Sequence, residues 1–129
     1  LENGSKVTGA EYARALGEVD VVKSLFANQL DQYDLLLSPT MAVPAFDVGQ
    51  HPKEINGREV HPFWGYLPFT FPINMIGYPA ASVPCGFSSE GLPIGLHIVG
   101  KPGREDTVLA ASAAFETARP WIQERPPVS

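Results

Sequence analysis

Cysteine and clustered positive charge are both scarce in this 129-residue sequence. The single cysteine, Cys85, excludes an internal disulfide and favours a reducing compartment, so we expect a cytoplasmic protein. The nine Lys and Arg residues are scattered among fourteen Asp and Glu, which gives a net charge of −5. Because nucleic-acid binding requires clustered cations that displace counterions, this balance argues against a nucleic-acid partner.

Long apolar runs and the common cofactor motifs are also missing. No segment approaches the roughly 20 apolar residues that cross a bilayer, and no basic segment followed by an apolar one marks a secretory signal, so no membrane association is expected. The sequence has no phosphate-binding glycine loop, dinucleotide fingerprint, HExxH or CxxC, and its three histidines are widely spaced. We therefore expect no metal and no cofactor.

Two amphipathic helices are what the sequence does contain. Thr8 and Glu11 have the spacing of a capping box and precede an apolar stripe, which predicts a helix over about residues 8–32. A second stripe predicts a helix over residues 104–119, ended by Pro120. Its buried side is expected to hold Val108, Leu109, Ala111, Ala114 and Phe115.

Strand patterns lie between these helices. The apolar run over residues 33–38 is closed by proline and predicts a strand buried on both faces, as in a parallel or mixed sheet. Two runs joined by the polar loop at residues 88–91 predict a β-hairpin over about residues 80–100, with Pro84 and Pro93 at an edge or a bulge. The order of these elements indicates a single α/β unit over residues 1–129, with a mixed sheet, flanking helices and one β-hairpin.

The segment from residue 41 to residue 68 predicts a long, irregular loop. Asn56 and Gly57 are typical of a type I′ turn, which predicts a small two-stranded flap within the loop. A short helix is expected over residues 69–77, with Thr70 as its N-cap and Gly77 at its end. Loops of this length in compact domains are commonly functional.

No nucleophile in the sequence has a clear partner. Cys85 and His97 would lie on neighbouring strands of the hairpin, but a lone cysteine in an apolar strand is typical of a buried, unreactive thiol. Ser82 and Ser88 have no base nearby in the sequence. The residues alone therefore indicate that this hairpin has a structural role and carries no catalytic group.

The stretches FTFPINMIGYPAASVPCGF (69–87), GLPIGLHIVGKP (91–102) and YDLLLSPT (33–40) resemble the C-terminal segment of the amidase signature family, which includes amidotransferase A subunits. The resemblance covers nearly the whole chain. It implies the C-terminal part of an α/β/α fold in a larger enzyme that hydrolyses a small-molecule amide through an acyl-serine intermediate. The family's Ser–cis-Ser–Lys triad belongs to a Gly/Ser-rich region that this sequence does not contain, so this chain alone is expected to be inactive.

The resemblance also implies a share of the substrate pocket. We expect this share to be formed by Thr40, Met41, Trp64, Phe69 and Asn74. Amidotransferase A subunits usually carry an Asp three residues before the threonine that matches Thr70, whereas this sequence has Leu67. That departure favours a less polar amide than glutamine. A non-catalytic interaction module and a fragment of an amidotransferase remain as alternatives, and unpaired apolar surface is expected to support a homodimer.

Overall fold

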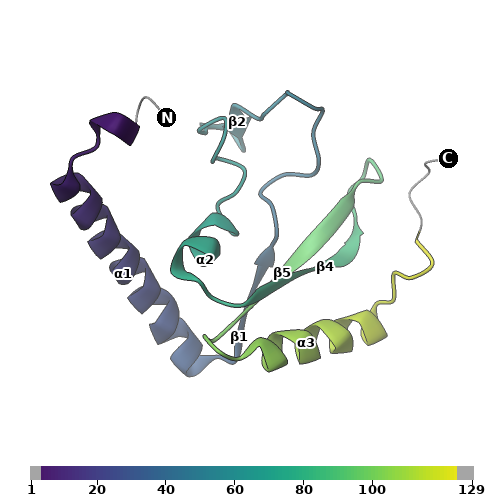
Figure 1. The fold of residues 1–129 in the computed structure, drawn as a ribbon. Coiled ribbons are helices and arrows are strands. Elements are labelled where there is room, and N and C mark those ends of the chain that lie inside the picture. Colours follow the sequence, from purple (N-terminus) through teal and green to yellow (C-terminus); the bar gives the residue numbers. More distant parts are fainter. Residues whose placement is uncertain (1–3, 125–129) are drawn as a thin grey trace.

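The computed structural model describes residues 4–124, and its centre is a three-stranded sheet (Figure 1). The elements in chain order are η1 (Gly4–Lys6), α1 (Gly9–Gln32), β1 (Leu35–Pro39), β2 (Glu54–Ile55), β3 (Arg58–Glu59), α2 (Phe71–Ile76), β4 (Ala80–Phe87), β5 (Pro93–Gly100) and α3 (Glu105–Ala118). The sheet has the order β1-β5-β4, so β5 is hydrogen-bonded on both sides. Helices and sheet together give the expected α/β class. Among the described residues, no helix is both long and apolar enough to span a membrane.

The helix α1 begins with the expected capping box. The Thr8 hydroxyl accepts from the Glu11 backbone N–H at 3.2 Å, and a Glu11 carboxylate oxygen accepts from the Thr8 N–H at 2.8 Å. The helix reaches the core from Val19 onward, and Leu30 is 1% exposed. Figure 1 shows that α1 meets the sheet at its C-terminal end and extends away from it.

The hairpin of β4 and β5 holds the sheet together. Both pairings of β5 are antiparallel, and the β4 register shifts between Pro84 and Gly86. The bulge expected at Pro84 is therefore present, since proline has no N–H for the ladder. Pro93 pairs with Phe87 at the start of β5, where the ladder ends.

Each face of the sheet has its own apolar cluster. On one face, Ile98 and Val83 pack with Val108 of α3. On the other face, Val99 packs with Leu30 of α1 and with Ile73 of α2. Ile76 and Tyr78 belong to the same buried cluster. The sheet therefore lies between α3 on one side and α1 with α2 on the other.

Two expectations about burial were wrong for the described chain. Leu109 and Ala114 of α3 are exposed, because a helix turns by about 100° per residue and Val108 takes the position that points at the sheet. Leu37 of β1 is 63% exposed, since α3 packs mainly over β4 and β5. The described strands form no parallel pair, so the mixed character expected of the sheet is not present within residues 4–124.

The loop and the short helix differ in one detail from expectation. Asn56 and Gly57 have positive φ angles of 51° and 74° and join β2 to β3, as a type I′ turn requires. Gly77 ends α2 in the left-handed region at φ 71°. Thr70 is the N-cap residue of α2 as expected, but it has a helical conformation and its side chain makes no capping hydrogen bond.

Candidate functional site

A row of polar side chains crosses the sheet at His97. Ser38 of β1 and Ser82 of β4 are its direct partners in the two strand pairings. Directly opposed residues of antiparallel strands place their side chains on the same face. We call Ser38, His97 and Ser82 the polar row. It lies two residues along β5 from Val99, on the face that packs against α1 and α2.

A pair of hydroxyl groups extends the polar row toward the loop. Thr40 Oγ1 and Ser82 Oγ are 2.7 Å apart, and the Thr40 backbone N–H donates to the Gly95 carbonyl at 2.9 Å. The two hydroxyls meet directly over Gly95, because a Cβ at this position would lie 2.5 Å from Ser82 Oγ and 2.6 Å from Thr40 Oγ1. The missing side chain of Gly95 thus gives the hydroxyl pair its space.

Ser38 and His97 resemble a nucleophile and its base, but their surroundings oppose that role. Ser38 Oγ lies 3.4 Å from His97 Nδ1, a long separation for a hydrogen bond, and also 3.1 Å from the Pro39 carbonyl, which can accept its proton. His97 is only 5% exposed. Neither Ser38 nor His97 lines the two cavities of the molecule that matter here, one of about 520 Å³ beside the long loop and one of about 1000 Å³ at the hairpin. A nucleophile must reach its substrate, so this pair is a structural contact.

Burial favours the neutral form of His97. Desolvation lowers the pKa of His97 from its ordinary value of 6.5, because the charged ring loses its hydration inside the sheet. The unfolded chain therefore takes up a proton more readily than the native chain as the pH falls below about 6.5. The stability that the neutral ring contributes is complete above that pH and is lost as the pH falls toward the lowered native pKa.

We therefore expect His97→Asn to reduce the acid sensitivity of the fold. Between pH 8 and pH 5, the urea midpoint of the unaltered protein should fall further than that of the variant, because the variant has no ring to protonate. Urea titrations followed by circular dichroism at several pH values measure the difference. Equal slopes against pH for the two proteins would contradict the buried, neutral ring.

The loop after β1 encloses a cavity of about 520 Å³. Met41 lines it, as do Phe46 of the loop and Ile94 of β5. The expected pocket residues Thr40 and Met41 thus lie together where β1 ends, with Thr40 in the hydroxyl pair and Met41 at the cavity wall. The Ala42 N–H donates to the Tyr66 carbonyl at 3.3 Å, which joins this wall to the returning end of the loop.

The other three expected pocket residues lie on the returning end of the loop and on α2. Trp64 is 48% exposed and contacts Phe71 with ring centroids 4.8 Å apart. Phe69 is 37% exposed, and Asn74 is an exposed residue of α2. Trp64 lies two residues before Tyr66, whose carbonyl accepts from Ala42, and this hydrogen bond links it to the Thr40–Met41 group.

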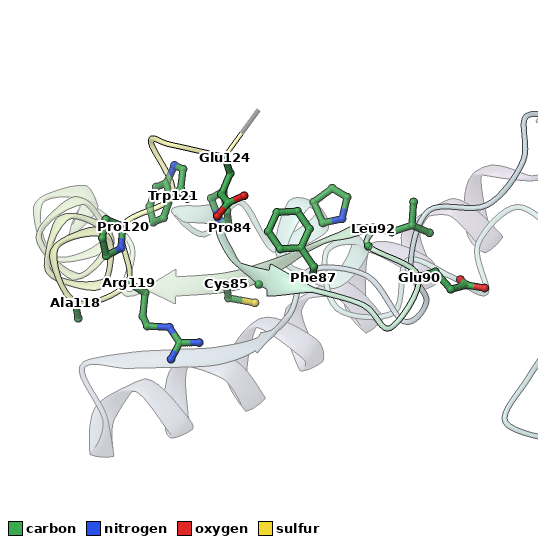
Figure 2. A pocket seen from close by; sticks show the side chains of 13 residues that line it. Pro84, Cys85, Phe87, Glu90, Leu92, Ala118, Arg119, Pro120, Trp121 and Glu124 are labelled. Atoms are coloured by element: carbon green, nitrogen blue, oxygen red, sulfur yellow. The ribbon is translucent and has the colours of Figure 1, made fainter. Parts of the chain in front are cut away.

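A larger cavity of about 1000 Å³ lies at the far end of the hairpin (Figure 2). Its lining comes from β4, the hairpin loop and the segment that follows α3, including Phe87 and Trp121. None of the five expected pocket residues lines it. Cys85 does, but its thiol donates to the Ile94 carbonyl at 3.4 Å. Within residues 4–124, no three His, Cys, Asp or Glu side chains are grouped to hold a metal ion.

Ser82 was missed as a pocket candidate because its partner is distant in sequence. Thr40 lies 42 residues before Ser82, and only the closing of both strands onto β5 brings the hydroxyls together. The sequence did carry a signal in Gly95. A glycine inside an apolar strand often marks a close approach by another group, and here that group is the hydroxyl pair.

Comparison with known proteins gives consistent matches. The family model described as Amidase matches residues 1–109. The A subunit of glutamyl-tRNA(Gln) amidotransferase from Methanosarcina mazei is 44% identical over 118 residues, which cover 90% of this chain and 23% of the relative. The chain therefore spans about a quarter of the length of such relatives.

Two solved structures share the fold. A bacterial aryl acylamidase of the amidase signature enzymes superimposes with a TM-score of 0.85 at 34% identity, over 97% of this chain and 27% of that one. A 6-aminohexanoate cyclic dimer hydrolase in complex with substrate gives the same TM-score at 33% identity, over 98% of this chain and 28% of that one. The same arrangement of helices and strands therefore recurs within larger enzymes.

Proposed function

Since this chain belongs to the amidase signature family, we propose that it is the C-terminal portion of an enzyme that hydrolyses a carboxylic amide through an acyl-serine intermediate. The observation that carries this proposal is the match to amidases over nearly the whole chain, together with the shortage of attacking groups in it. Cys85 donates its thiol proton to a carbonyl, and the contact of Ser38 with the buried His97 is long, at 3.4 Å, and part-buried. In this proposal the nucleophile and its base belong to residues outside this chain.

The proposed contribution of this chain is one wall of the substrate pocket. A serine nucleophile attacks the amide carbonyl, the amine leaves with a proton from the general acid, and water then releases the acid. Each step needs the amide held in a fixed orientation. We assign this holding role to Thr40, Met41, Trp64, Phe69 and Asn74. The Thr40 hydroxyl, fixed by Ser82, can exchange a hydrogen bond with a neutral amide.

The chemistry of this wall supports a less polar amide than glutamine. Leu67 is half-buried and replaces the carboxylate that would pair with a charged α-amino group. An unpaired charge in a desolvated pocket costs on the order of 1–3 kcal/mol of binding. One solved relative is an aryl acylamidase, which is consistent with such a substrate. The competing proposal, an amidotransferase A subunit, is favoured by the 44% identity to that protein.

Labelling with a fluorophosphonate, which reacts with activated serines, tests the mechanism. In the protein as its gene encodes it, we expect one adduct, on a serine outside residues 1–129, and unchanged labelling after Ser38→Ala. The 129-residue chain alone should show neither adduct nor amide hydrolysis. Peptide mass spectrometry locates the adduct. An adduct on Ser38 or Ser82, or turnover by the chain alone, would contradict the proposal.

Substrate comparison separates the two candidate functions. We expect the protein as its gene encodes it to hydrolyse a neutral amide with a kcat/KM at least about tenfold above that for glutamine, since about 1.4 kcal/mol of lost pairing corresponds to a factor of ten. Glutamine hydrolysis at an equal or greater rate would instead support the amidotransferase.

We also propose that this chain, by itself, forms a homodimer in the cytoplasm through its exposed apolar surface. Val21 and Leu25 lie one turn apart on the same face of α1 and are 60% and 61% exposed, although they are large apolar residues. Exposed apolar patches are typical of interaction surfaces. Gel filtration with light scattering should give a dimer that becomes monomeric after Leu25→Glu. A monomeric unaltered chain would contradict this proposal.

A further inference from the structure

Three aromatic rings form an exposed cluster where the long loop returns to α2. Phe63 and Trp64 meet edge-to-face with ring centroids 4.6 Å apart, and Trp64 contacts Phe71 at 4.8 Å. These three rings are 53%, 48% and 43% exposed. We call Phe63, Trp64 and Phe71 the aromatic cluster. Its rings are ordered against one another while their outer surfaces stay open.

The turn that carries two of these rings is held in place by His61. Its Nδ1 accepts hydrogen bonds from the backbone N–H groups of Phe63 at 3.1 Å and Trp64 at 3.2 Å. The Gly65 N–H donates to the His61 carbonyl at 2.7 Å, and Gly65 sits so close to Val60 that a Cβ would clash with the Val60 side chain. Such a fixed turn lowers the entropy cost of binding a ligand against its rings.

The aromatic cluster adjoins the proposed pocket wall. Tyr66, two residues after Trp64, accepts the backbone hydrogen bond of Ala42, and Ala42 together with Met41 lines the 520 Å³ cavity. Phe71 begins α2, the helix that carries Asn74. Trp64 and Phe71 are therefore linked through the backbone to residues assigned to the wall.

The two runs that supply the cluster and the wall carry no formal charge in the sequence, although Arg58 and Glu59 of the flap directly precede the first of them. The run from Val60 to Ser89 contains no Asp, Glu, Lys or Arg, and neither does the run from Leu35 to Phe46 that supplies the wall. A ligand with a charged group would find no opposite charge in either run. A neutral ligand with a flat apolar ring matches both the charge and the surface.

We infer that the aromatic cluster binds an aryl group of an uncharged amide substrate, with Trp64 as the ring that selects it and His61 as a positioning residue. This inference rests on the proposed function for the fate of the amide, but the binding of the aryl group is independent of hydrolysis. Edge-to-face and stacked contacts favour an aromatic ring over a saturated ring of similar size.

Equilibrium binding to a matched pair of probes tests the inference. Acetanilide and N-cyclohexylacetamide differ only in whether the ring is aromatic. Calorimetry on the protein as its gene encodes it should give a lower Kd for acetanilide by about 3- to 10-fold, the factor expected from one aromatic contact. Trp64→Leu, which keeps an apolar side chain, should abolish this preference by raising the Kd of acetanilide more than that of the cyclohexyl amide.

Two further variants show which feature is responsible. His61→Ala should reduce the preference, and His61→Asn should restore it, because an asparagine oxygen can accept the same two backbone N–H groups. Phe87→Leu is the matched control: Phe87 is 53% exposed, like Phe63, but lines the larger cavity. It should leave the preference unchanged.

Each outcome bears on the inference separately from the function. If neither probe is hydrolysed but the preference depends on Trp64, the inference stands and the proposed function fails. Hydrolysis without any aryl preference, or with a preference that survives Trp64→Leu, overturns the inference alone. A preference lost in Phe87→Leu would place the aryl group in the larger cavity. Absence of binding because other parts of the polypeptide cover the cluster would also overturn it.

Discussion

Replacing Ile98 with alanine is expected to lower the free energy of unfolding by about 2–5 kcal/mol, the range for large-to-small changes in a core. Ile98 is 1% exposed and lies on β5, which is the only described strand bonded on both sides. It packs in one cluster with Val83 and Val108. The cavity left by the missing side chain would therefore weaken the contact of the sheet with α3.

Leu37 provides the matched control for this change. It is the direct partner of Ile98 on β1, but it is 63% exposed. Leu37→Ala should change the free energy of unfolding by less than about 1 kcal/mol, because little packing is lost at an exposed position. Urea unfolding followed by circular dichroism measures both values. If both variants lost the same free energy of unfolding, the packing of Ile98 against α3 would contribute no more to stability than an exposed side chain does.

Replacing Gly95 with alanine is the second large effect that we expect, at about 1–3 kcal/mol. The added methyl group would lie within 2.6 Å of both Ser82 Oγ and Thr40 Oγ1, so the two hydroxyls must separate and lose their hydrogen bond. Part of this cost should vanish when Ser82 is already alanine. A double-mutant cycle with Gly95→Ala and Ser82→Ala measures that coupling.

Gly17 of α1 is the control for the change of glycine to alanine itself. Nothing lies within 4 Å of a Cβ at this position. In an exposed helix, alanine is favoured over glycine by about 0.5–1 kcal/mol, so Gly17→Ala should raise stability. If Gly95→Ala also raised stability, the hydroxyl pair would not be packed tightly over Gly95.

Local patterns were sufficient for the elements that depend on neighbours in the sequence. The capping box of Thr8 and Glu11, the turn at Asn56–Gly57 and the hairpin bulge at Pro84 all follow from residues within a few positions of one another. The prediction failed at Leu109 and Leu37, where burial depends on which element covers the residue. A helix stripe or an apolar run shows that a residue can be buried, but not that a partner is present.

The candidate site could be predicted only in part for the same reason. The resemblance to a family pointed to Thr40 and Trp64, but not to the partners of these residues. Ser82 reaches Thr40 across 42 positions, while His61 accepts the backbone N–H of Trp64 from only three residues away, in a turn that the spacing of residues did not reveal. These contacts require strands and loops to be placed in space before they can be recognised.

The sequence by itself determined the family, the capped helix, the hairpin and the lack of charge along the proposed pocket wall, because each is a property of residue types in order. Only the tertiary structure decided which polar groups meet over Gly95, that His97 is buried and neutral, and that three rings form one exposed cluster. The physical reason is that hydrogen bonds, desolvation and ring contacts act over a few ångströms. Residues far apart along the chain come within that distance only when β1 and β4 close onto β5.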